Sequence, residues 1–81
     1  MTPTEQVRAR VEELTRSIAA SPSDASLYEQ RGRLYWQLRD IPRCFADYDR
    51  AVSLDSASPA RHHKQMAQQI LSFYNKEMYN P

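Results

Sequence analysis

The sequence of 81 residues has little glycine, little cysteine and few β-branched residues, with one glycine and one cysteine in all. Strands favour β-branched side chains and need glycine at many turns, so these shortages favour an all-α fold. The lone Cys44 excludes an intramolecular disulfide and cannot build a metal cluster by itself. No apolar run approaches the ~20 residues of a membrane span, and the charges spread over residues 1–17 are unlike a secretory leader. We therefore expect a cytoplasmic protein with no membrane partner.

The sequence also lacks an excess of charge of one sign. Eleven Lys and Arg stand against ten Asp and Glu, which leaves a formal net charge of +1. A nucleic-acid-binding protein usually carries a basic patch or a strong excess of positive charge. The interspersed charges therefore predict no nucleic-acid partner. The length allows a single domain, residues 1–81, with a core built from a few amphipathic elements.

Capping residues and apolar spacing predict four helices. The first begins with Thr2 as N-cap and Pro3 in the first turn, and its apolar residues recur at helical spacing until about Ala20. Turn and cap residues divide the remainder into helices over about residues 25–38, 41–54 and 58–78. Because the loops are short, we expect successive antiparallel helical hairpins.

Residues 25–56 alternate small and aromatic positions. The small residues Gly32, Cys44 and Ala51 leave room that the tyrosines of the facing helix fill, and these tyrosines are Tyr28, Tyr35 and Tyr48. The pattern resembles the tetratricopeptide repeat (TPR), and residues 52–55 are similar to its usual ending. The resemblance implies one full repeat at 25–56 between two half-repeats, at 1–22 and 58–79. It also implies a right-handed superhelix of about four helices.

Two residues depart from the TPR pattern. Arg39 stands in the inter-helix turn, where the family often has glycine, and Arg31 stands at a usually apolar site. A left-handed backbone at a residue other than glycine costs ~1 kcal/mol, so we expect the turn at Arg39 to be built differently. We expect Arg31 to lay its aliphatic stem along the edge of the core.

In the TPR family the first helices of successive repeats line a concave surface that receives peptides or partner helices. The resemblance implies that residues 25–38 and 58–78 form this surface. On the earlier helix, a rotation of about 100° per residue separates a second, more polar face from the small and aromatic positions. The candidate ligand-binding residues from the two helices are Glu29, Arg33, Trp36, Gln37, His63, Ala67 and Ile70.

Trp36 is unexpected on a polar face, and two interpretations stay open. Trp36 is either an aromatic anchor for a ligand, with Arg33 available to pair with a carboxylate, or it packs against the fourth helix of its own chain. TPR proteins that bind chaperone tails grip a terminal carboxylate with Lys, Asn and Arg residues. Glu29, at a place where a basic residue would be wanted, argues against that specificity.

The last helix is apolar over an unusually wide arc. Its apolar residues between Met66 and Met78 cover ~160°, whereas one packing face requires a stripe of ~100°. Part of this arc stays exposed in a monomer, so we expect Phe73, Tyr74 and Met78 to join a second copy, as in a homodimer, or another protein. The alternative is that the helix ends early and residues 74–81 fold back over the core.

No pattern typical of catalysis or metal binding is present. The adjacent His62 and His63 point about 100° apart on a helix and cannot chelate one metal together, and Asp47 and Asp49 face different sides. We therefore expect no enzyme, no cofactor and no metal. The sequence predicts a protein-protein interaction module that binds a peptide or helix in the TPR groove. The alternative is a self-assembling structural homo-oligomer joined through the C-terminal helix.

Overall fold

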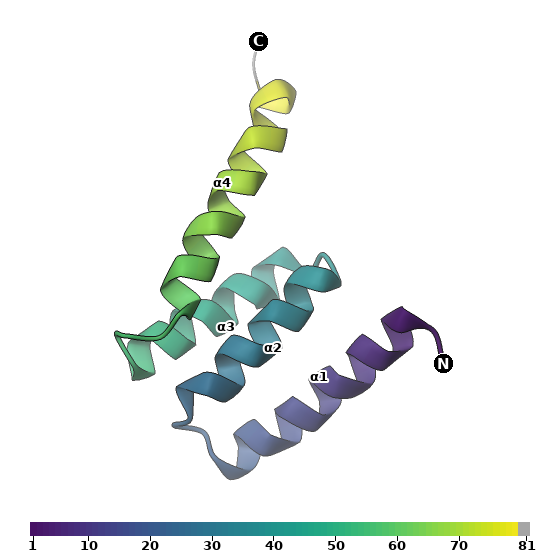
Figure 1. Ribbon diagram of the computed structural model, residues 1–81, viewed down its shortest axis with the longest axis vertical. Coiled ribbons are helices and arrows are strands. Elements are labelled where there is room, and N and C mark those ends of the chain that lie inside the picture. The colour runs from purple at the N-terminus through teal and green to yellow at the C-terminus, as the bar shows by residue number, and fades with distance from the viewer. Residues whose placement is uncertain (80–81) are drawn as a thin grey trace.

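The computed structural model contains four α-helices in a simple order: α1 (Pro3–Ala20), α2 (Ala25–Gln37), α3 (Ile41–Leu54) and α4 (Ala60–Tyr79) (Figure 1). The structure describes residues 1–79, and residues 75–79 by their backbone alone. Within this part of the chain there is no strand, so the predicted all-α class is confirmed.

Side-chain oxygen atoms cap the helices near their predicted starts. The Thr2 hydroxyl accepts a hydrogen bond from the Glu5 amide at 3.1 Å, and the Ser58 hydroxyl accepts one from the Ala60 amide at 3.1 Å. Each bond satisfies an amide that has no partner within its own helix. The local sequence signals therefore place the helix boundaries closely.

The last helix does not end early. α4 continues through Tyr74 to Tyr79, so the expectation that residues 74–81 fold back over the core is wrong for the helical part of that segment. Asn80 and Pro81 lie outside the described residues.

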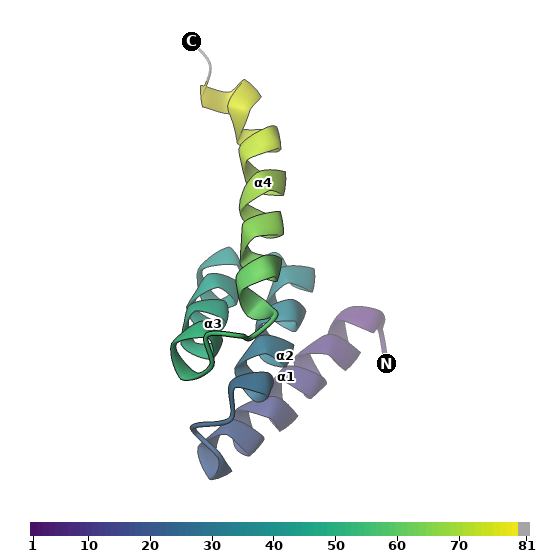
Figure 2. The same cartoon turned by 60° about the vertical axis from the view of Figure 1, so that its left-hand side comes forward.

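The first three helices lie side by side, and each short loop reverses the chain, so that neighbours run antiparallel (Figure 1). α4 packs against α3, and its C-terminal half extends beyond the other helices in both views (Figures 1 and 2). The molecule measures 48 × 36 × 15 Å along its principal axes. The end of α4 projects from the body that the other three helices form (Figures 1 and 2).

The core lies where α2, α3 and the start of α4 meet. Its buried members are Cys44, Tyr48, Ala51 and Ala60. Gly32 of α2 faces the Tyr48 ring so closely that a Cβ atom there would stand 2.7 Å from two ring carbons. A methyl group does not fit in that space, so glycine allows the two helices to meet at this point. The expectation that Gly32 makes room for an aromatic ring is confirmed.

Arg31 connects three helices. Its guanidinium donates two hydrogen bonds to the Asp47 carboxylate of α3, at 2.8 and 2.7 Å, and one to the Thr15 hydroxyl of α1 at 3.2 Å. The Tyr28 and Tyr35 ring centroids each lie 5.8 Å from the guanidinium carbon, within the range of a cation–π attraction. The hydrogen bonds to Asp47 raise the pKa of Arg31 above its usual value. The stem alone was expected to meet the core, but the charged group itself is paired and largely enclosed.

The turn between α2 and α3 is left-handed at Arg39, which has φ 61°. The Arg39 amide donates to the Trp36 carbonyl at 3.0 Å, and the Asp40 amide donates to the Tyr35 carbonyl at 2.9 Å. These two bonds form the helix ending known as the Schellman motif, whose left-handed position glycine usually occupies. The expectation that Arg39 avoids this conformation is wrong. The two bonds satisfy helix carbonyls, and Asp40 caps α3 directly afterwards, so the fold imposes the conformation.

Removal of the Asp47 carboxylate tests the link between the helices. The Asp47 side chain is 6% exposed and that of Arg31 is 18% exposed, so Asp47→Ala leaves an enclosed cation without its carboxylate partner. We expect the free energy of unfolding in urea to fall by about 3 kcal/mol, the lower end of the cost of breaking a buried ion pair, because Arg31 is partly exposed and keeps its hydrogen bond to Thr15. The control is Glu13→Ala, which removes the Arg10–Glu13 pair, whose side chains are both more than half exposed. That change should cost less than about 0.5 kcal/mol, and equal losses in the two variants would contradict the assigned role of Arg31.

The left-handed turn is tested by comparing two substitutions at one position. Arg39→Gly and Arg39→Ala both remove the guanidinium, which lies 6.0 Å from the Trp36 ring. Only glycine also removes the strain of the positive φ. We therefore expect the glycine variant to be more stable than the alanine variant by about 1 kcal/mol in thermal or urea unfolding. The opposite order would show that Arg39 is not left-handed in solution.

Candidate functional site

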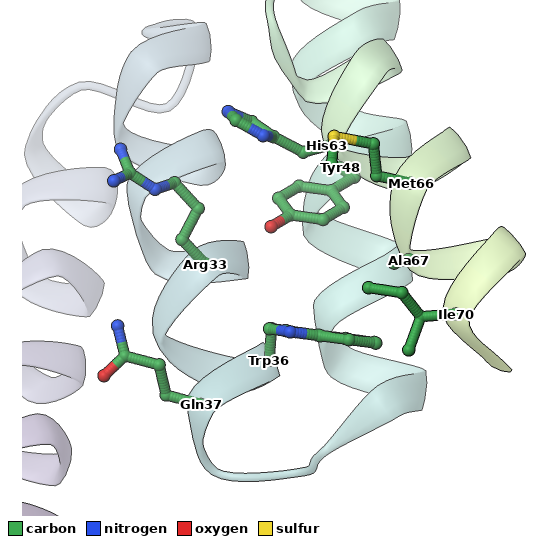
Figure 3. A pocket seen from close by; sticks show the side chains of 8 residues that line it. All are labelled: Arg33, Trp36, Gln37, Tyr48, His63, Met66, Ala67 and Ile70. Atoms are coloured by element: carbon green, nitrogen blue, oxygen red, sulfur yellow. The ribbon is translucent and has the colours of Figure 1, made fainter. Parts of the chain in front are cut away.

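A groove opens between α2 and α4, with α3 beneath it. Its cavity volume is about 260 Å³. Trp36 reaches from α2 toward Ile70 on α4. The Tyr48 side chain projects from α3 into the space between α2 and α4 (Figure 3). The residues that line the groove are Arg33, Trp36, Gln37, Tyr48, His63, Met66, Ala67 and Ile70. The groove therefore combines apolar side chains with a polar rim.

Six of the seven candidate ligand-binding residues line this groove. They are Arg33, Trp36, Gln37, His63, Ala67 and Ile70. The seventh, Glu29, lies beneath the surface and is 7% exposed. Its carboxylate stands 3.2 Å from His63 Nε2 and 3.6 Å from the Arg33 guanidinium, so it joins α2 to α4 and does not face the groove.

Two further residues line the groove without having been predicted there. Tyr48 was assigned to the core, and its ring does pack on Gly32, but one part of the side chain also forms the floor of the groove. Met66 is 48% exposed and precedes Ile70 by one helical turn. That spacing could have placed Met66 beside Ile70 from the sequence, whereas the position of Tyr48 depends on how far α4 stands from α2.

Trp36 lies between the core and the groove. Its ring packs against the core cluster from the side, yet it also lines the groove. A second cavity of about 500 Å³ begins on the other side of the ring, lined by Trp36, Arg39, Ile41, Ile70, Leu71 and Tyr74. Trp36 and Ile70 belong to both cavities. The recess between α2 and α4 therefore continues past Trp36 toward Tyr74.

Positive charge predominates at the rim of this recess. The Arg33 side chain is 58% exposed and only weakly held by Glu29 at 3.6 Å, and Arg39 is exposed at the far end. The Glu29 carboxylate beside Arg33 is largely buried and is held by His63. Apart from His63, the ionisable side chains with a basic group among the described lining residues of the two cavities are Arg33 and Arg39.

The groups below the groove stay protonated at neutral pH. Burial raises the pKa of the Cys44 thiol to about 11 and raises the pKa of the Tyr48 hydroxyl above its usual value. Desolvation is the main cause in both cases, because a buried thiolate or phenolate loses its hydration. Neither group is thereby prepared as a nucleophile.

The residues expected at an oligomer interface lie further along α4. Phe73 is 74% exposed and Tyr74 is 68% exposed, and their rings meet edge to face with centroids 5.6 Å apart. Met78, the third residue of that group, has a side chain outside the described part. The structure therefore places the two aromatic residues on the surface of α4.

Among the described residues, no three His, Cys, Asp or Glu side chains gather in a way that could hold a metal ion. None of the described helices has the length and apolar character that crossing a membrane requires.

Comparison of the chain with protein-family models, with curated proteins and with solved structures gave no match. The TPR resemblance therefore depends on the residue pattern of the chain itself.

The raised pKa values predict how stability depends on alkaline pH. Between the ordinary thiol pKa of about 9 and the folded value of about 11, the unfolded chain has lost the Cys44 proton and the folded chain has kept it. Stability should therefore fall as the pH rises through this window, by at most about 1.4 kcal/mol per pH unit for one group. Urea unfolding of wild type and Cys44→Ala at pH 7 to 10.5 measures the effect. The wild type should lose more stability than the variant, and parallel profiles would contradict the raised pKa of Cys44.

Proposed function

We propose that this chain is a protein-binding module of the TPR type that takes a peptide or a partner helix in the groove between α2 and α4. One observation carries the proposal: six side chains from two separate helices, selected as candidate ligand contacts from the sequence, line a single groove. Trp36 is its aromatic anchor and Arg33 its carboxylate partner. Trp and Arg are the residue types that most often dominate binding energies at protein interfaces.

The TPR arrangement is part of the proposal. It is supported by the α2–α3 hairpin, in which glycine faces an aromatic ring across the helix pair, and by α1 and α4 on either side. In that arrangement α2 and α4 are the first helices of successive repeats. The groove between them then corresponds to the concave ligand-binding surface of the family.

The side chains that line the groove indicate which kind of ligand it binds. An apolar side chain of the ligand enters beside Trp36 and Ile70, where Ile70 is 42% exposed and loses water on binding. A carboxylate of the ligand meets the Arg33 guanidinium at the rim, where a charge-assisted hydrogen bond is available. The ligand is therefore an amphipathic segment with an acidic residue close to an apolar one.

The proposal is tested with a displayed library of random 12-residue peptides. Peptides are selected on the wild type, and their affinities are then measured for the wild type, Arg33→Glu and Trp36→Ala. We expect each groove variant to weaken binding at least ~10-fold, because one repels the ligand carboxylate and the other removes the apolar anchor. Circular dichroism confirms that each variant is folded, and Arg33→Glu is the safer test because Arg33 is exposed.

Arg16→Glu is the matched control, since it makes the same change of charge at an exposed position of α1. It should leave the affinities within about twofold of wild type, because Arg16 is not in the groove. Failure to enrich any peptide, or selected peptides that bind Arg33→Glu and Trp36→Ala as tightly as wild type, would refute the proposed function.

A further inference from the structure

Four apolar side chains on α4 lie open to solvent: Met66 is 48% exposed, Ile70 42%, Phe73 74% and Tyr74 68%. Their positions i, i+4, i+7 and i+8 form one continuous stripe along the helix. We call Met66, Ile70, Phe73 and Tyr74 the α4 stripe. Its far end is carried by the half of α4 that extends beyond α1, α2 and α3 (Figure 2).

The surroundings of the α4 stripe are unusually free of charge. Residues 65–74 contain no Asp, Glu, Lys or Arg, although 26% of the whole chain is charged. A charged stripe would repel an identical stripe, because like charges would face each other across the contact. This neutral stripe meets an identical one without that penalty.

The other described helices offer no comparable surface. The apolar residues Leu14 and Ile18 of α1 are already buried, at 2% and 9% exposure. Cys44, Tyr48 and Ala51 of α3 are likewise buried in the core. Contact between two copies therefore occurs where both can contribute α4.

We propose that a second copy of this chain covers the α4 stripe, with the two α4 helices packed antiparallel about a two-fold axis near Ile70. Each copy supplies the neighbouring helix that the other lacks. The antiparallel arrangement opposes the helix dipoles and keeps the two basic first turns, which contain Arg61 and Lys64, at opposite ends. A two-fold contact is also self-complementary, so the assembly closes at two copies.

The area of the α4 stripe limits the size of the dimer interface. The four side chains bury ~400 Å² per copy, given that a wholly exposed large aromatic residue contributes 150–250 Å². The total of ~800 Å² is smaller than the ~1,200 Å² of stable interfaces. An interface of this size is typical of weak, reversible association, so we expect a dimer in exchange with monomer.

The dimer interface overlaps the groove. Met66 and Ile70 belong both to the α4 stripe and to the groove lining, so a second copy on the stripe covers the α4 wall of the groove. Dimerisation itself does not depend on the proposed ligand-binding function. If both occur, they compete by mass action, and a groove ligand shifts the chain toward monomer.

Sedimentation equilibrium from 1 to 500 µM tests the dimer. The wild-type mass should rise from monomer toward dimer, and Phe73→Glu should raise the dissociation constant at least ~10-fold because it places a carboxylate in each copy's stripe. The matched control is Gln68→Glu, which adds the same charge at an exposed position on the opposite flank of α4, beside Lys64. It should dimerise like the wild type.

Cysteine cross-linking tests the antiparallel geometry in a Cys44→Ala background. Met66→Cys mixed with Phe73→Cys should form the mixed disulfide far faster than either protein cross-links to itself. A monomer mass at every concentration, a dimer that Phe73→Glu leaves intact, or preferential self-cross-linking would each overturn the proposal. Peptide binding is measured at 1 µM, the monomer end of the concentration series, so loss of ligand binding and loss of dimerisation are measured independently.

Discussion

The structure depends on the close approach of α2 and α3 at Gly32. The Tyr48 ring fills the space that a side chain on Gly32 would occupy, so the two helices meet with their backbones near each other. One residue earlier, Arg31 reaches across the same interface to Asp47 and also holds Thr15 of α1. A steric requirement and an ion pair thus fix the same alignment of α2 against α3. The rest of the chain is arranged around this helix pair.

The groove follows from that arrangement. Because Tyr48 lies against Gly32, its ring stands between α2 and α4 and sets the depth of the recess. Glu29, one turn before Gly32 on α2, is bound by His63 and so holds the first part of α4 in place. The C-terminal half of α4 extends beyond the other helices (Figure 2). The same helix therefore has two different surroundings, a groove wall on one side and an exposed apolar stripe that continues toward its end.

The sequence predicts well what local interactions decide. The caps at Thr2 and Asp40 and the apolar spacing place the helices, and the helical period gathers Arg33, Trp36 and Ile70 at one groove. The sequence predicts poorly which charged side chains are buried, because their partners lie far away along the chain. Burial of Glu29 depends on His63, and enclosure of the Arg31 guanidinium depends on Asp47, sixteen residues away. The turn at Arg39 was predicted wrongly for another reason. The hydrogen bonds of the Schellman ending and the cap that follows outweigh the cost of a left-handed backbone at a residue other than glycine.

Trp36 is the single tryptophan of the chain, and it stands between the two cavities with the Arg39 guanidinium 6.0 Å from its ring. Its fluorescence therefore originates from one known place. Water in the recess and the nearby cation both influence the emission wavelength of an indole. An occupant that excludes water from the recess changes that environment directly. The wavelength of maximum Trp36 emission therefore reports whether the space beside Trp36 is filled.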